Sequence, residues 1–177
     1  MQHPEVQAFF DEASHTFSYV AWDPATARAA VFDSVLDYDA ASGRTRHTSA
    51  DALIAFVRAQ GLGVDWVIDT HVHADHLSAS PYVQAQLGGR IGIGEHIRDV
   101  QDTFGQLFNA GAGFWRDGSQ FDHLFGDGEH YMVGSIEAVA MHTPGHTPAC
   151  VTHVVGDAAF VGDTLFMPDY GTARCDF

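Results

Sequence analysis

The chain has 177 residues, and its composition, 46% hydrophobic and 18% charged, is ordinary for one globular domain. Eight basic residues against 23 acidic ones leave a formal net charge of −15, which excludes the basic surface that nucleic-acid binding needs. No apolar run approaches the roughly 18 residues that cross a membrane, and the N-terminal stretch lacks the regions of a signal peptide. We therefore expect a cytoplasmic protein without nucleic-acid or membrane partners.

The first part of the chain reads as strands around one helix. Four short runs rich in aromatic and β-branched residues predict strands at residues 17–22, 29–32, 35–36 and 64–68. Apolar residues recur at helical spacing over residues 50–60, which predicts an amphipathic helix there. Ser49 is its expected N-cap, and Gly61 stands where a C-terminal cap belongs.

Helices and strands continue beyond residue 68. Two further helices are predicted at residues 81–87 and 94–109, on either side of a strand at 90–93. After a Gly-rich irregular piece, four more strands are expected at residues 131–133, 136–141, 151–155 and 158–161. This mixed order favours an α/β sandwich with the sheets inside and the helices outside.

A loop rich in potential metal ligands follows the strand at 64–68. Four such side chains stand in the sequence Asp69-Thr-His-Val-His-Ala-Asp-His-Leu77, namely His71, His73, Asp75 and His76. In an extended loop, side chains two residues apart point to the same side, so His71 and His73 can converge on one ion while the other two face a neighbouring position. Four candidate ligands in six positions predict a metal-binding loop.

Two later residues complete the candidate site. His146 follows the strand at 136–141, and the turn at Pro144-Gly145 can aim its ring at a fixed point. Asp163 comes after Gly162, at the end of the strand at 158–161. Strand ends that deliver two histidines and an aspartate to one place can hold a catalytic metal and leave positions open for a substrate.

These residues also carry a resemblance to a known family. Thr70-His-Val-His-Ala-Asp-His76, Thr143-Pro-Gly-His-Thr147 and Gly162-Asp163, in this order, resemble the motifs of the metallo-β-lactamase fold superfamily. The resemblance covers most of the chain and implies an αββα sandwich. Hydrolases of that fold usually draw one more histidine from a C-terminal strand, for which this chain has no room. We therefore expect a single domain over residues 1–177 that is truncated at its C-terminus.

The final residues resemble one branch of the superfamily. Phe166-Met-Pro-Asp-Tyr-Gly-Thr-Ala-Arg-Cys-Asp-Phe177 is similar to the corresponding segment of the persulfide dioxygenases, also called sulfur dioxygenases, and so are Thr147-Pro-Ala-Cys150 and Val35-Leu-Asp-Tyr38. The similarity is greatest to bacterial members, including those described as β-lactamase hydrolase-like. Enzymes of the glyoxalase II type typically place a Gly-Lys-Phe-Tyr element here, and this chain has no Lys.

The resemblance implies a specific site and reaction. One Fe(II) would be held by His71, His146 and Asp163, and glutathione persulfide would be oxidised by O₂ to sulfite and glutathione. In that interpretation the side chains that orient the ligands and shape the pocket are His73, Asp75 and His76. Arg174 would contact a glutathione carboxylate or the persulfide, because its planar guanidinium suits bidentate contacts.

Two alternatives stay open. The chain could be a dinuclear zinc hydrolase of a glutathione thioester or a lactone, with a metal-bound hydroxide as nucleophile and the second ion bound by His73, Asp75 and His76. It could also be a binding module that a metal merely stabilises. The sequence leaves the oligomeric state open as well, a homodimer included.

Overall fold

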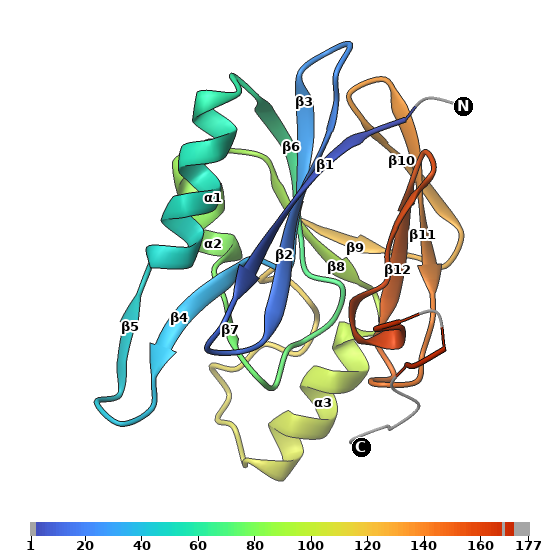
Figure 1. The fold of residues 1–177 in the computed structure, drawn as a ribbon. Helices are drawn as coiled ribbons and strands as arrows, with labels where there is room; N and C mark the ends of the chain where they lie inside the picture. The colour runs from blue at the N-terminus through green and yellow to red at the C-terminus, as the bar shows by residue number, and fades with distance from the viewer. Residues whose placement is uncertain (1–2, 168, 172–177) are drawn as a thin grey trace.

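The structure, a computed structural model, describes residues 3–167 and 169–171, and its strands form two packed sheets and a small third one (Figure 1). The first sheet has six strands, in spatial order β1 (Glu5–Asp11), β2 (Thr16–Asp23), β3 (Arg28–Phe32), β6 (Gly63–Ile68), β8 (Arg90–Gly94) and β9 (His123–Phe125). The second sheet has four antiparallel strands, β10 (Glu129–Val133), β11 (Ile136–His142), β12 (Val151–Val155) and β13 (Ala158–Phe160). The small sheet joins β5 (Arg44–Arg46), β4 (Val35–Asp39) and β7 (Leu77–Ser78).

Strand β3 shows how the layers are held together. Ala29 and Val31 pack into a cluster with α1 (Thr48–Ala59) and α2 (Ser80–Leu87). Ala30 and Phe32, which point the other way, pack against the second sheet. Alternate side chains of a strand face opposite sides of the sheet, so a strand that is apolar on both sides belongs in the middle of a layered fold. The middle of the six-stranded sheet is thus buried between helices and the second sheet.

Helix α1 follows its predicted pattern but not its predicted N-cap. Leu53, Ile54 and Val57 are buried on one face, and Gly61, with φ of +67°, lies just beyond the C-terminal residue. The helix begins at Thr48, with His47 at the N-cap position. The Ser49 hydroxyl donates instead to the carboxylates of Asp11 and Asp37. The assignment of Ser49 as N-cap was therefore wrong, because nearby carboxylates compete for its hydroxyl.

The other predicted helices and strands are present with small differences in their bounds, whereas β1, β5, β7 and β9 were not predicted. Helix α3 spans Ile97–Leu107, shorter than predicted at both ends, and packs through Ile97 and Val100. A single 3₁₀ turn, η1 (Gly162–Thr164), follows β13. Within the described residues no helix covers the outer face of the four-stranded sheet, where Met132 and Met141 are exposed (Figure 1). None of the described helices has both the length and the apolar character needed to span a bilayer.

Candidate metal centre

The histidine loop begins at the carboxyl ends of two neighbouring parallel strands. Strands β3 and β6 pair in parallel, so the residues that follow them, Asp33 and Asp69, emerge at the same edge of the sheet. That edge is where open α/β sheets commonly place their ligands. The backbone N–H of Val151, at the start of β12, donates to the Thr70 carbonyl at 2.9 Å. The loop after β6 is therefore fixed to the second sheet as well as to the first.

Three predicted ligands from three separate segments meet here. His71 lies in the loop after β6, His146 in the connection between β11 and β12, and Asp163 in η1. Each offers a ligand atom, and these atoms all lie within 4.8 Å of one another. His146 Nε2 is 3.4 Å from Asp163 Oδ2, and the rings of His71 and His146 are nearly perpendicular, with centroids 4.9 Å apart. The structure thus brings together residues that are up to 92 positions apart in the sequence.

The side chains of this group have the properties of metal ligands. His71 is buried, and its Nε2 has no hydrogen-bond partner among the described residues, a costly arrangement unless something binds there. Burial, and then the neighbouring His73, lower the pKa of His71 to about 3, which keeps its ring neutral, the form that binds metals. Burial raises the pKa of Asp163, and a cation would offset that cost. Two imidazoles and a carboxylate are a donor set for Fe(II) or Zn(II).

A second group lies beside the first. His73, Asp75 and His76 also offer ligand atoms within 4.8 Å of one another, and the rings of the two histidines stack with centroids 4.1 Å apart. His73 Nε2, however, is 3.0 Å from Asp33 Oδ1, and both side chains are almost fully buried. The spacing of the loop predicted that His71 and His73 share one ion. The structure does bring these two rings together, with centroids 4.1 Å apart, but the ligand atoms of His71 group with those of His146 and Asp163, which lie in connections of the second sheet.

The contact with Asp33 fixes the charge of His73. Burial opposes charge on both side chains, but their mutual attraction outweighs it. The pKa of His73 is raised to about 9, and that of Asp33 is lowered to about 2. His73 is therefore an imidazolium that donates to an ionised Asp33 in the metal-free protein.

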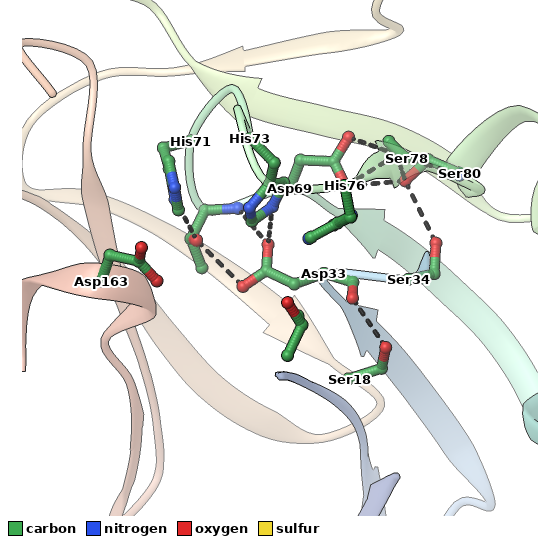
Figure 2. A network of polar contacts seen from close by, with 12 residues as sticks. Ser18, Asp33, Ser34, Asp69, His71, His73, His76, Ser78, Ser80 and Asp163 are labelled. Carbon is green, nitrogen blue, oxygen red and sulfur yellow. Dashed lines mark hydrogen bonds and ion pairs between the residues drawn. The ribbon is translucent and has the colours of Figure 1, made fainter. Parts of the chain in front are cut away.

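Two buried carboxylates at this site were not predicted as functional residues. Figure 2 shows Asp33 and Asp69 at the centre of a polar network around the histidine loop. Asp69 accepts hydrogen bonds from the hydroxyls of Ser78 and Ser80, at 2.8 and 2.9 Å, and burial raises its pKa to about 6. The sequence does hold a signal for both, because each aspartate directly follows a buried strand and therefore lies at the edge of the sheet.

An open cavity of about 570 Å³ gives access to the site. Asp163, His73 and Asp75 lie on its wall. Aromatic and apolar side chains form much of the remainder, among them Phe17, Tyr19, Phe160, Leu165 and Phe166. Arg174, the predicted substrate contact, lies outside the described residues.

Comparison with known proteins shows the family. The family described as the Metallo-beta-lactamase superfamily matches residues 12–176. A Burkholderia pseudomallei protein named "Probable metallo-hydrolase" is 58% identical over 97% of this chain and 62% of its own length. Glyoxylase B2 of Dictyostelium discoideum is 44% identical over 98% of the chain and 60% of its own length. The human mitochondrial persulfide dioxygenase ETHE1 is 28% identical over 97% of the chain and 56% of its own length.

A solved structure supports the same conclusion. The crystal structure of ETHE1 from Myxococcus xanthus aligns with a TM-score of 0.72 and 26% identity, covering 98% of this chain and 62% of that one. The chain therefore spans about three fifths of the length of the relatives named here. The match over nearly all of the sequence, the two packed sheets and the histidine–aspartate cluster at their edge agree with one another. This chain belongs to the metallo-β-lactamase superfamily, a family of metal-dependent enzymes.

Proposed function

We propose that this chain is a persulfide dioxygenase that oxidises glutathione persulfide with O₂ to sulfite and glutathione. The observation that carries the proposal is the cluster of His71, His146 and Asp163, with ligand atoms within 4.8 Å of one another and a buried, unpartnered Nε2 on His71. A two-histidine, one-carboxylate set is the donor set of non-haem Fe(II) oxygenases. Fe(II) bound there would supply the redox chemistry with O₂ that Zn(II) cannot.

The pairing of His73 with Asp33 supports one ion in preference to two. A second metal would need His73 as a neutral ligand, and its Nε2 is already committed to a buried carboxylate at 3.0 Å. Removing it would leave Asp33 as a buried charge without that partner, which is costly. His73 also lies on the wall of the cavity, where its ring could donate a hydrogen bond to an anionic sulfur.

The cavity supplies the surroundings that the reaction needs. Phe17, Tyr19 and Phe160 line it beside Asp163 and give the approach to the site an apolar wall. Arg174 is proposed to bind a glutathione carboxylate through its guanidinium. The human persulfide dioxygenase and the Myxococcus xanthus structure, at 28% and 26% identity, give the proposal its reaction type. We place this reaction in the cytoplasm.

A second candidate has its own observation. The group of His73, Asp75 and His76 could hold a second ion if His73 left Asp33, since its ligand atoms also lie within 4.8 Å of one another. Together with the first group it would form a dinuclear zinc hydrolase acting on glutathione thioesters or lactones. The 44% identity to Dictyostelium glyoxylase B2 supports this reading.

Oxygen uptake tests the proposal. The chain, purified without oxygen and loaded with Fe(II), is given glutathione persulfide while dissolved O₂ and sulfite are measured. We expect about one sulfite for each O₂ consumed, and no uptake from the Asp163→Asn variant, which keeps the side-chain shape but loses the charged ligand. Folded, iron-bearing protein that consumes no O₂ would contradict the dioxygenase. Hydrolysis of a glutathione thioester by the zinc-loaded chain would then favour the second candidate.

A further inference from the structure

A buried chain of hydrogen bonds leads from Asp33 to His71. The Thr70 backbone N–H donates to Asp33 Oδ1 at 2.7 Å, and the Thr70 hydroxyl donates to Asp33 Oδ2 at 2.9 Å. The same hydroxyl oxygen is 3.0 Å from His71 Nδ1. All three residues are at least 95% buried. Solvent is therefore kept from the chain of contacts.

The count of protons along this chain fixes the state of the His71 ring. Asp33 is surrounded by donors, because the Thr70 N–H, the Thr70 hydroxyl and His73 Nε2 all point to its two oxygens. A carboxylate in such surroundings is ionised and can only accept. The single proton of the Thr70 hydroxyl then belongs to the bond with Asp33. Its oxygen is left as an acceptor, so the proton shared with His71 must sit on Nδ1.

Gly162 lies against the contact between Thr70 and His71. A Cβ atom on Gly162 would lie 2.5 Å from the Thr70 Oγ1 atom and 3.4 Å from His71 Nδ1. Its φ of +51° also favours glycine. The segment that carries Asp163 thus passes so close to the Thr70 hydroxyl that a residue larger than glycine at position 162 would displace one or the other.

We propose that Thr70 is a positioning residue that selects the Nδ1–H tautomer of His71 and so directs the Nε2 lone pair at the ion. The ionised Asp33 fixes the direction of the Thr70 hydroxyl proton, and the Thr70 oxygen then accepts the proton of His71 Nδ1. The inference rests on the proposed function only in taking His71 as a metal ligand. If the His71 ring already has its proton on Nδ1, no proton has to move when the metal binds. Hydrogen-bond partners of metal-bound histidines generally fix the tautomer in this way.

The test compares two substitutions at Thr70 with a matched control. Thr70→Val removes the hydroxyl at nearly constant shape, and Thr70→Ser restores it. Thr152→Val is the control, because Thr152 is also a buried threonine whose hydroxyl is 2.9 Å from that of another threonine, Thr143, and not from a proposed ligand. Two quantities are measured: the ¹⁵N chemical shifts of the His71 ring in the metal-free protein, and the dissociation constant for Fe(II).

The expected results separate this role from a merely structural one. The wild type and Thr70→Ser should show a protonated Nδ1 and bind Fe(II) alike. Thr70→Val should shift His71 toward the Nε2–H form and weaken Fe(II) binding about 10- to 100-fold, whereas Thr152→Val should leave both quantities at wild-type values. A protonated Nε2 on His71 in the wild type would overturn the proposal, even if Thr70→Val failed to fold. Unchanged Fe(II) binding by folded Thr70→Val would overturn it as well. Because neither readout requires turnover, absence of O₂ uptake would count against the dioxygenase alone.

Discussion

His153 is a fully buried histidine in the core between the two sheets. Its Nδ1 is 3.0 Å from the Tyr131 hydroxyl, and its Nε2 has no hydrogen-bond partner among the described residues. Burial lowers its pKa to about 4, from about 6.5 in an unfolded chain. The neutral ring is therefore the form that fits the fold. His153 therefore does not lower the free energy of unfolding above pH 6.5. As the pH falls from 6.5 toward 4, it lowers that free energy increasingly, because only the unfolded chain binds the proton.

We expect this histidine to make the fold acid-sensitive. Between pH 7.5 and 5.5, His153 should remove about 1 kcal/mol from the free energy of unfolding of the metal-free protein. His153→Gln keeps a side chain that can bond to Tyr131 but cannot titrate in this range. Urea unfolding at both pH values should show that the variant loses about 1 kcal/mol less than the wild type. Equal losses would mean that His153 is protonated, or reaches water, in the folded state.

The sequence predicted the role of a single residue best where its residue type, in that position, serves few functions in proteins. Imidazole and carboxylate groups at strand ends marked His71, His146 and Asp163 as candidate ligands, the family resemblance grouped them into one site, and the structure brings them together. Asp33 and Thr70 were not assigned a role, since buried aspartate and threonine side chains serve many purposes. Only their hydrogen bonds in the folded protein, 2.7 to 3.0 Å long, show the role of these two residues.

At the scale of an element, the turn into η1 controls how closely Asp163 approaches the histidine loop. Gly162→Ala would impose a left-handed conformation on an alanine and push a Cβ atom against the Thr70 hydroxyl. Gly61→Ala is the matched control, because Gly61 has φ of +67° but nothing within 4 Å of the added atom. The control isolates the backbone penalty, about 1 kcal/mol.

We therefore expect different results from the two alanine variants. Gly61→Ala should lose about 1 kcal/mol of stability and bind Fe(II) as the wild type does. Gly162→Ala should lose more stability and also bind Fe(II) more weakly, which denaturant unfolding and metal titration can measure. Equal effects of the two substitutions on both quantities would show that Gly162 serves only the backbone.

Elements with local signals were predicted, and elements built from distant contacts were missed. Helix α1 was found from its own apolar spacing. Strand β1 was not, because most of its side chains are exposed and the adjacent Phe9 and Phe10 interrupt the polar–apolar alternation. Strands β7 and β9 are two and three residues long and exist through pairing with β4 and β8, so no local pattern could reveal them.

At the scale of the whole molecule, the order of helices and strands predicted the α/β class. The same order favoured a sandwich of sheets, the resemblance named it as that of the metallo-β-lactamase fold, and the layers of Figure 1 and the family match confirm both. The position of the site at the carboxyl ends of β3 and β6 follows from that architecture. The architecture does not determine how the six ligand-type side chains divide into two groups. That division depends on how the loop turns and on the contact of His73 with Asp33.

The number of metal ions bound by each chain tests the central claim most directly. Metal-free protein is titrated with Fe(II) under nitrogen, and with Zn(II) separately, and the bound metal is measured after gel filtration. One ion per chain is expected for the wild type and for Asp75→Asn, and none for Asp163→Ala, because His71, His146 and Asp163 form the only tight site in this account. Two ions in the wild type, falling to one in Asp75→Asn, would contradict the mononuclear centre and support the dinuclear hydrolase.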